Sequence, residues 1–458
     1  MANKNYVYLF KEGKKEMKSI LGGKGANLAE MTNIGLPVPT GLIITTECCN
    51  EYLAADGEFP RGMEEQLKEK LQVVEQEMGK NFGDENNPLL VSVRSGAPVS
   101  MPGMMDTILN LGLNDKNMKG FIDVVGDEWF VKDSYRRFIQ MFGNVVLDID
   151  GQDFEDVLDR IKTENKLESD QQLTPKMFDE IIEEFKSIIL SQAGIEFPQD
   201  PEEQLKMAVQ AVFDSWNNDR AKVYRKINNI QDDLGTAVNV QAMVFGNMGD
   251  DCGSGVAFTR NPSTGENKLY GEYLINAQGE DVVAGIRTPL SIENLKDQMP
   301  KIYDEFFEIC EMLEKHYRDM QDIEFTIEKN KLYILQTRSG KRTASAAVKI
   351  AVDMVKEDLI SKAEAVQRIE PQQLENIMHS RIDPEADLEP VARGLQASPG
   401  AAKGMIIFDA DEAEQLVETE NAEVILVRTE TTPDDIHGMV AAQGILTSRG
   451  GMTSHAAV

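Results

Sequence analysis

The chain has 458 residues, of which 41% are hydrophobic and 27% charged, a composition that excludes a disordered or fibrous protein. Asp and Glu number 78 against 47 Lys and Arg, which gives a formal net charge of −31. Such a charge repels nucleic-acid phosphates and anionic lipids, so we expect no nucleic-acid partner and no membrane partner. At about 150 residues per domain, the length predicts roughly three domains.

The cysteines and the N-terminus indicate a reduced compartment. Only four cysteines are present (Cys48, Cys49, Cys252 and Cys310), and their spacing makes neither a disulfide framework nor a CxxC metal pair. Residues 1–17 lack the apolar core of a signal peptide, and no stretch has the apolar length of a membrane span. We therefore expect a cytoplasmic protein.

The first half of the chain mixes short strands with helices. Glycines 22, 23 and 25 bracket Lys24 in a loop, and a helix follows that stops before Gly35. From about residue 116 to 213 the pattern is mainly helical and acidic, and we interpret it as a helical insert. The other expected elements here are strands at 6–10 and 89–94 and a helix at 63–78.

Strand patterns return after the insert. Residues 323–338 predict a hairpin turning at Lys329–Asn330. Residues 343–370 are helical again, and the polar, proline-punctuated stretch 371–390 is the candidate linker. Two further strands are expected at 236–245 and 255–260.

The last part of the chain predicts an α/β unit. Strands at 404–408, 423–427 and 444–447 alternate with helical segments at 411–417 and 433–440. The chain stops three residues after His455, so we expect this domain to be truncated. We also expect the region from about Ala392 onward to be the least stable, because its strands would lose part of their apolar cover.

His455 stands out among the histidines because its sequence, GGMTSHAAV, predicts a ring at a helix N-terminus. The positive end of a helix keeps imidazole neutral and nucleophilic, and its free N–H groups stabilise a phosphoryl group on the ring. Thr453 and Ser454 could cap the helix or touch that phosphate. An ordinary capped helix with an incidental histidine is the alternative.

Two basic residues are candidates for phosphate contacts. Lys24 lies at a helix entry between glycines, although GGKGAN lacks the spacing of a P-loop. Arg94 ends an apolar strand, where a guanidinium can bind phosphate through two hydrogen bonds. A solvated lysine and a surface ion pair are the alternatives.

The predicted hairpin carries a candidate divalent-cation group. Asp322, Glu324 and Gln336 could converge two carboxylates and an amide oxygen, which are ligands suited to Mg²⁺ held against nucleotide phosphates. Arg338 lies two residues past Gln336 on the same strand face. Solvent-facing acidic residues are the alternative in a protein this acidic.

Together, several long motifs make the whole chain resemble the pyruvate, phosphate dikinase family. They are LGGKGANLAEM, VSVRSGA with SMPGMMDTILNLGLN, DSYRRFIQMF, FTRNPSTGE, GEYLINAQGEDVVAGIRTP, LEKHYRDMQDIEFTIE with LQTRSGKRTA, ASPGAAKG and GGMTSHAAV.

The resemblance implies an α+β and α/β multidomain fold. It implies an ATP-grasp nucleotide-binding domain over 1–340 with a helical insert at about 112–213. A helical segment and linker follow over 341–390, and then the N-terminal part of a swivelling phosphohistidine domain over 391–458. The family's C-terminal pyruvate-binding barrel is expected to be absent.

The resemblance also implies roles for individual residues. His455 would be the phosphocarrier, and Lys24, Arg94 and Arg338 would bind ATP, with Arg136 and Arg137 as further phosphate contacts. Asp322, Glu324 and Gln336 would hold Mg²⁺. Thr453 matches a threonine that a regulatory kinase modifies in plant members.

The implied reaction converts ATP, orthophosphate and pyruvate into AMP, pyrophosphate and phosphoenolpyruvate, reversibly, through a phosphohistidine. This chain would carry only the ATP half, with the pyruvate or phosphoenolpyruvate site beyond it. The family's homodimer contacts would be largely missing, so we expect the chain to exist as a monomer. A water-using dikinase, similar to phosphoenolpyruvate synthase, and a non-catalytic nucleotide-binding fragment are the alternatives.

Overall fold

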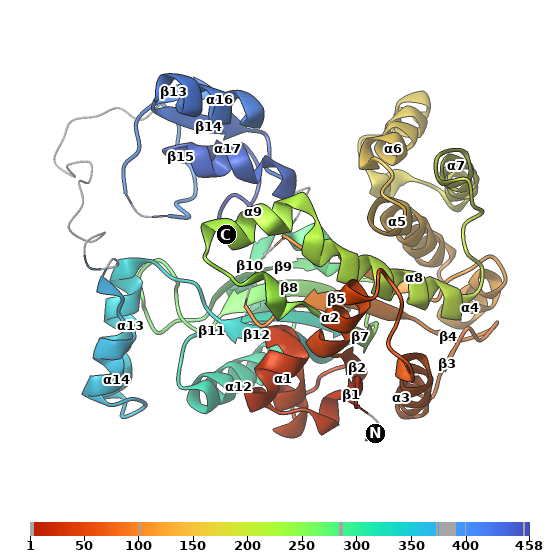
Figure 1. Cartoon of the computed structure of the whole chain (residues 1–458), viewed down its shortest axis with the longest axis horizontal. Coiled ribbons are helices and arrows are strands. Elements are labelled where there is room, and N and C mark those ends of the chain that lie inside the picture. Colours follow the sequence, from red (N-terminus) through yellow and green to blue (C-terminus); the bar gives the residue numbers. More distant parts are fainter. Residues whose placement is uncertain are drawn as a thin grey trace. The chain divides into compact units, whose positions relative to one another are not determined.

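The computed structural model describes residues 4–99, 101, 103–283, 287–371, 374, 391–398, 400–451 and 454–458. The chain is a mixed α/β protein that divides into two compact units, Met1–Val244 and Phe245–Val458. Figure 1 shows the helices and strands of both.

An antiparallel sheet with strand order β1-β2-β7-β5-β6 forms the centre of unit 1. Val91, Val93 and Val240 of this sheet are buried. Helix α1 packs closely on it, since a Cβ on Gly25 would lie 3.0 Å from Ile43 and 2.8 Å from Asn239. The elements of unit 1 are β1 (Val7–Leu9), α1 (Lys18–Asn33), β2 (Gly41–Ile44), α2 (Thr46–Ala54), α3 (Met63–Met78), β3 (Asn81–Phe82), β4 (Pro88–Leu89), β5 (Val91–Gly96), β6 (Thr107–Leu111), α4 (Asn117–Val125), α5 (Glu128–Val146), α6 (Gly151–Asn165), α7 (Pro175–Ala193), α8 (Pro201–Asp214), α9 (Asp219–Ile227) and β7 (Ala237–Ala242).

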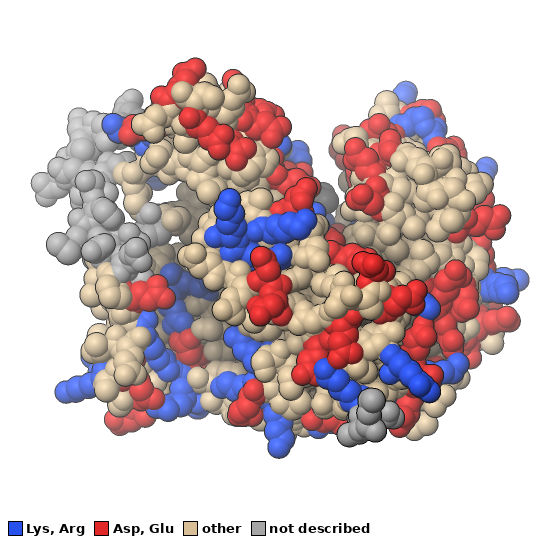
Figure 2. Space-filling model, viewed as in Figure 1, with Lys and Arg blue, Asp and Glu red and all other residues tan. Residues whose placement is uncertain are grey.

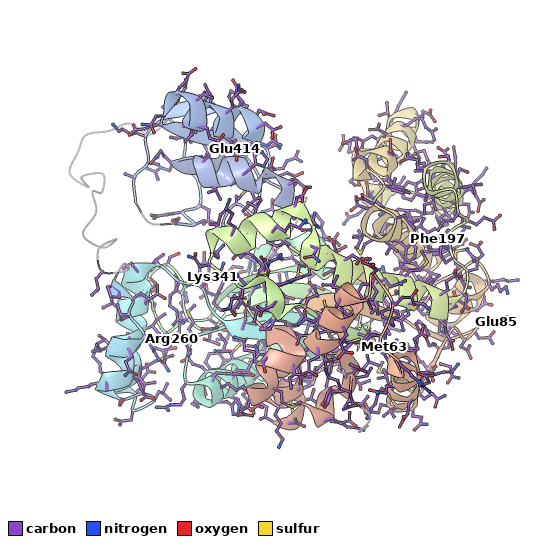
Figure 3. The ribbon with its side chains drawn as sticks, in the orientation of Figure 1. Met63, Glu85, Phe197, Arg260, Lys341 and Glu414 are labelled. Atoms are coloured by element: carbon purple, nitrogen blue, oxygen red, sulfur yellow. The ribbon has the colours of Figure 1, made fainter. Side chains whose placement is uncertain are left out.

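The helical character predicted for about 116–213 is confirmed by helices α4 to α8, and the assignment of this region as an insert stays a prediction. Helices α5, α6 and α7 lie side by side within unit 1, whereas α8 packs on strands β5, β6 and β7 (Figure 1). Phe197, labelled in Figure 3, contacts Phe138 and Phe142 with ring centroids 5.5 and 5.4 Å apart. Large aromatic rings therefore give the insert a core of its own.

Unit 2 contains a second antiparallel sheet, with strand order β10-β9-β8-β11-β12. Helix α12 packs on one face, where the rings of Phe306 and Phe325 lie 4.4 Å apart. The predicted hairpin is confirmed, and Lys329 and Asn330 both take positive φ values of 49° and 58°, as a tight two-residue turn requires. The elements are β8 (Gly253–Phe258), β9 (Tyr270–Ile275), α10 (Gly279–Val283), β10 (Leu290–Ser291), α11 (Leu295–Gln298), α12 (Pro300–Tyr317), β11 (Gln321–Glu328), β12 (Lys331–Ser339), α13 (Ala344–Lys356) and α14 (Lys362–Gln367).

A buried ion-pair cluster joins the elements around this sheet. Arg260, at the end of β8, is fully buried, and its Nη2 lies 2.6 Å from Glu314 Oε1 on α12 and 2.5 Å from Glu357 Oε2 after α13. Figure 3 labels Arg260 beside these elements. Since a buried charge is tolerated only with its partners, this cluster fixes α12 and α13 against the sheet.

The last part of unit 2 is a small parallel sheet with strand order β13-β14-β15. Its elements confirm the predicted alternation: β13 (Met405–Ile407), α16 (Ala410–Glu420), β14 (Val424–Arg428), α17 (Ile436–Ala441) and β15 (Gly444–Thr447). Ile407, Ala413, Val424 and Leu426 form its core. Several acidic side chains lie on the visible surface over α16, between other residues (Figure 2).

Two predictions fall on residues that the structure does not describe. They are most of the linker, residues 372, 373 and 375–390, and Thr453. The predicted domain boundaries at 340 and 390 stay predictions, and the division at Val244 falls inside the predicted first domain. Among the described residues, no helix has the length and apolar character of a membrane span.

Candidate functional site

His455 lies where two loops meet at the carboxyl edge of the parallel sheet. One loop follows β14 and the other follows β15, and the backbone N–H of Arg449 joins them by donating to Thr429 O at 3.0 Å. The carboxyl edge of a parallel sheet is a common ligand-binding position. A cavity of about 180 Å³ lies there, lined by Glu430, Thr431, Thr432, Thr447, Arg449, Gly450, Ser454, His455 and Ala456.

The hydrogen bond of the imidazole defines its tautomer. Nδ1 of His455 lies 3.3 Å from the carbonyl oxygen of Thr431. Because a carbonyl oxygen can only accept, Nδ1 must carry the proton. In the neutral ring this leaves Nε2 with its lone pair, and the exposed side chain presents a nucleophilic nitrogen.

The loop that carries Thr431 is held by a buried carboxylate. Asp435 accepts a hydrogen bond from the backbone N–H of Thr432 at 2.8 Å, and its other oxygen lies 3.1 Å from Arg428 Nη2. Arg428 is the last residue of β14. The strand end thereby positions the carbonyl that orients His455.

Three residues follow His455 in this chain, and a single turn is present where the sequence predicts the start of a helix. Residues 454–457 form a turn, in which the backbone N–H groups of Ala457 and Val458 both donate to Ser454 O at 3.0 Å. A single turn does not by itself have the aligned peptide units that make a helix dipole. Gly450 has a φ of 108°, which favours glycine at this position.

The hairpin brings the four predicted residues of β11 and β12 together. Asp322 pairs with Arg338 across the strands, and Glu324 pairs with Gln336. Arg338 Nε donates to Asp322 at 2.5 Å, and Gln336 Nε2 donates to Glu324 at 2.9 Å. Asp322 and Gln336 are each 6% exposed, so these side chains are not solvent-facing.

The electrostatics of this group depend on burial. Burial raises the pKa of Asp322 above its ordinary value, against the opposing effect of Arg338. Lys341, labelled in Figure 3, lies just beyond the strand, and burial and then Arg338 lower its pKa. The sequence reasoning missed Lys341, although it belongs to the same SGKRTA motif as the end of β12.

The oxygen donors on the hairpin fit a hard divalent cation. Glu324 keeps one carboxylate oxygen, and Gln336 its amide oxygen, outside their mutual hydrogen bond. Asp322 is already paired with Arg338, so it is the weaker candidate. In the described part of the chain, no group of three or more His, Cys, Asp and Glu residues could hold a metal ion. The hairpin set has only two carboxylates, Asp322 and Glu324, and its third member is the amide of Gln336.

A close approach of α1 to the end of β5 brings Lys24 near the strand that carries Arg94. Gly22 has a φ of 70° and lies inside α1 as a kink, where the sequence predicted a separate loop before the helix. A Cβ on Gly22 would lie 1.6 Å from the carbonyl oxygen of Gly96, two residues past Arg94. Only glycine permits this approach, which places Lys24 beside the end of β5.

Arg136 and Arg137 are engaged within the helical insert. Both guanidinium groups contact the buried Asp133, at 2.5 and 2.8 Å, one helical turn earlier on α5. Arg136 is 4% exposed. The arrangement is that of an intrahelical ion pair, and the spacing in DSYRR contained this signal.

Comparisons with known proteins cover nearly the whole chain. The family described as "Pyruvate phosphate dikinase, AMP/ATP-binding domain" matches residues 18–58, 59–306 and 301–359. The chain belongs to the pyruvate, phosphate dikinase family. Residues 420–458 match the family described as "PEP-utilising enzyme, mobile domain".

Curated members of the dikinase family are similar throughout. The chain is 56% identical to a pyruvate, phosphate dikinase of Rhizobium meliloti (strain 1021), over 99% of this chain and 52% of that protein. The chain is 55% identical to a pyruvate, phosphate dikinase of Clostridium symbiosum, over 99% of this chain and 52% of that protein. It is 56% identical to the chloroplastic enzyme of Mesembryanthemum crystallinum, over 98% of this chain and 47% of that protein. The chain thus spans about half the length of the curated relatives it matches.

Proposed function

We propose that this chain performs the ATP-dependent half of a dikinase reaction, in which His455 receives phosphoryl groups from ATP. The observation that carries the proposal is the imidazole of His455, whose Nδ1 donates to Thr431 O. Its place in a region similar to a mobile phosphoenolpyruvate-utilising domain supports the same role.

In the proposed step, the lone pair of His455 Nε2 attacks the β-phosphorus of ATP. A nitrogen–phosphorus bond forms and the bond between the β-phosphorus and the bridging oxygen of AMP breaks, so that AMP leaves. An oxygen of orthophosphate then attacks the terminal phosphorus, and the bond between that phosphorus and the oxygen bridging it to the histidine-bound phosphorus breaks. Pyrophosphate leaves, and the phosphoryl group that stays on Nε2 makes phosphohistidine. The Thr431 carbonyl holds the Nδ1 proton and stabilises the positive charge of the modified ring.

Basic residues are proposed to offset the negative charge of the phosphates. Lys24 and Arg94 are assigned to the nucleotide phosphates, and Arg338 to the charge near the hairpin. Arg449 lines the His455 cavity and is assigned to the carried phosphoryl group. Arg136 and Arg137 receive no phosphate role in the proposal, because Asp133 already pairs with both.

Glu324 and Gln336 are the residues that would hold Mg²⁺. When bound, the ion supplies charge neutralisation to the nucleotide phosphates. The hairpin holds the two ligands opposite each other, since Glu324 and Gln336 are cross-strand partners whose side chains share a hydrogen bond. We also propose that the nucleotide-binding part of the chain has an ATP-grasp fold.

In the complete reaction proposed for the full-length protein, phosphohistidine gives its phosphoryl group to pyruvate, which becomes phosphoenolpyruvate. The proposed reaction is reversible. No residue of this chain is assigned to pyruvate. The expected cytoplasmic location and the monomeric state of the chain stay predictions, and sedimentation of the purified chain measures the latter.

The testing experiment uses ATP labelled in its β-phosphate. The purified 458-residue chain is incubated with labelled ATP and Mg²⁺, and protein-bound label and AMP are measured before and after orthophosphate is added. We expect acid-labile, base-stable label on the protein, AMP release, and pyrophosphate release that requires orthophosphate.

Other outcomes separate the alternatives. Release of orthophosphate from the terminal position without added orthophosphate indicates a water-using dikinase. ATP binding without label or AMP shows a nucleotide-binding module and contradicts the proposal for this chain.

A further inference from the structure

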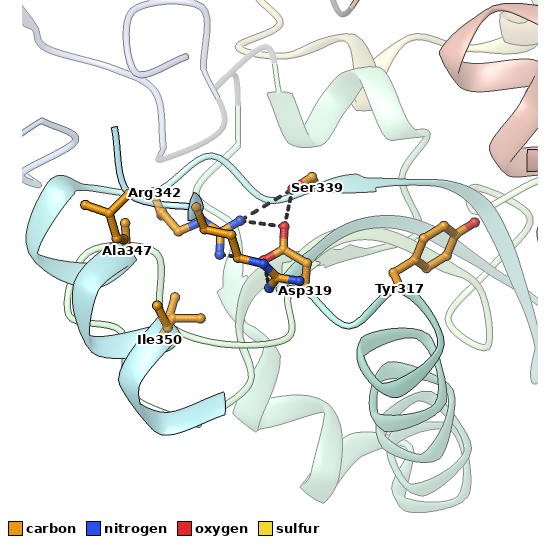
Figure 4. A pocket seen from close by; sticks show the side chains of 9 residues that line it. Tyr317, Asp319, Ser339, Arg342, Ala347 and Ile350 are labelled. Carbon is orange, nitrogen blue, oxygen red and sulfur yellow. Dashed lines mark hydrogen bonds and ion pairs between the residues drawn. The ribbon is translucent and has the colours of Figure 1, made fainter. Parts of the chain in front are cut away.

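A second cavity lies in unit 2, among residues to which the proposed function gives no role. It has a volume of about 410 Å³, within the range of small-molecule sites. Figure 4 shows it beside α13 and the end of β12. Its lining residues are Tyr317, Asp319, Ser339, Arg342, Ala347, Ile350, Ala351, Arg368 and Ile369.

One arginine in this cavity is rigidly positioned. Arg342 contacts both carboxylate oxygens of Asp319 at 2.8 Å, and its Nε donates to the carbonyl oxygen of Gly340 at 3.1 Å. Ser339 Oγ donates to the same carboxylate at 2.5 Å, and Figure 4 shows these contacts converging on Asp319. Asp319 thus holds the Arg342 guanidinium in one orientation.

The second arginine has a much weaker partner. Nη1 of Arg368 lies 3.6 Å from the already engaged Asp319, and the side chain is 31% exposed. This is the one ion pair that Arg368 makes with a described residue. Two guanidinium groups therefore share one carboxylate, which leaves a net positive charge in a strongly acidic protein.

Aliphatic side chains supply part of the remaining cavity lining, although polar atoms make up more of its surface. Ala347, Ile350 and Ala351 of α13 are buried, and Ile369 contributes a further aliphatic surface. Polar groups of fixed geometry beside aliphatic side chains are a combination found in ligand sites.

We propose that this Arg342–Arg368 cavity binds a small organic anion, with one carboxylate or phosphate group on a compact apolar body. Arg368 supplies the charge that is least neutralised, and the α13 side chains contact the apolar body. A cluster that only fastened α14 to the sheet would need neither the volume nor the second guanidinium.

The test measures binding at the cavity itself. Isoleucine δ1-methyl groups of the full chain are labelled for NMR, and the signals of Ile350 and Ile369 are assigned by substitution to valine. Benzoate and phenyl phosphate are titrated as probes that share one ring and differ in the anionic group, with neutral benzamide as control. We expect saturable shifts of both methyl groups with at least one anion and none with benzamide.

Two matched substitutions test the role of charge. Arg368→Gln is expected to weaken anion binding at least tenfold, whereas Lys362→Gln, which removes a charge from exposed Lys362 on α14, leaves it within twofold. If Arg368→Gln does not fold, Ala351→Met tests the site by filling the cavity, and it should abolish the shifts. Absent shifts at Ile350 and Ile369, equal binding of benzamide, or unchanged affinity in the variants would overturn the proposal.

Discussion

The two sheets of unit 2 hold their candidate site residues in different ways. In the hairpin sheet both faces are buried, with Ile323 and Phe325 at 0% and 1% exposure on one face and Asp322 and Gln336 at 6% on the other. In the parallel sheet the face of Val424 and Leu426 is buried, while Ile406 and Leu446 are 59% and 53% exposed.

This difference matches the two kinds of chemistry proposed. Ligands for a metal and a nucleotide need fixed distances, which hydrogen-bonded strands provide. A carrier histidine has to meet more than one reaction partner, and an exposed loop side chain at a sheet edge suits that task. The comparison predicts that substitutions in the hairpin sheet affect the stability of the fold and the affinity for Mg-ATP. Substitutions near His455 should affect phosphoryl transfer alone.

The largest effect is expected for His455→Asn. Protein-bound label from β-labelled ATP should fall to background, because the asparagine amide has no nucleophilic lone pair, while ATP affinity stays within twofold. His437→Asn is the matched control in the same α/β region and should keep its label. Label that survives in His455→Asn would remove the carrier role.

Arg260→Met should cost roughly 3–5 kcal/mol in the free energy of unfolding of unit 2, since it leaves Glu314 buried without its partner. Amide hydrogen exchange of α12 measures the change. Arg318→Met, which removes a half-exposed ion pair with Glu364, should cost at most about 1 kcal/mol. Similar losses in the two variants would contradict the importance of burial.

Ile323→Ala tests the packing of the hairpin sheet. Its side chain is fully buried, so the cavity left behind should cost about 2–5 kcal/mol, read from hydrogen exchange of β11. A loss below about 1 kcal/mol would show that this sheet is less tightly packed than its burial indicates.

Glu324→Ala should weaken binding of Mg-ATP about tenfold, which corresponds to about 1.4 kcal/mol of binding free energy. The free energy of unfolding of unit 2 should change by no more than about the same 1.4 kcal/mol. Gln336→Ala should act in the same direction. Titration calorimetry gives the affinity, and exposed Glu308→Ala on α12 is the charge-matched control. Unchanged affinity in both hairpin variants would remove these residues from the metal site.

The smallest effect is expected for Ile406→Ala, the counterpart of Ile323→Ala. Since Ile406 is largely exposed, hydrogen exchange of β13 should change by no more than about 0.5 kcal/mol. Limited proteolysis of the unmodified chain should also cut first after about residue 391. A large loss in Ile406→Ala would show that the exposed face of the parallel sheet is covered in solution.

Local patterns in the sequence predicted much of the fold correctly. The helix at 63–78, the strand at 444–447 and the turn at Lys329–Asn330 were all predicted with their bounds. Each depends on local features, namely hydrophobic periodicity and residues that accept a positive φ. At His455 the sequence predicted the start of a helix, and within this chain, where three residues follow His455, a hydrogen-bonded turn forms there.

By itself, the sequence determined the family, the mixed α/β class and the candidate residues, because long motifs and short-range periodicity are written along the chain. Only the tertiary structure decided which of those residues meet. It paired Asp322 with Arg338 and oriented His455 through Thr431. It also enclosed Arg342 and Arg368 in one cavity. Such contacts depend on burial and on chain segments distant in sequence, and no local pattern encodes them.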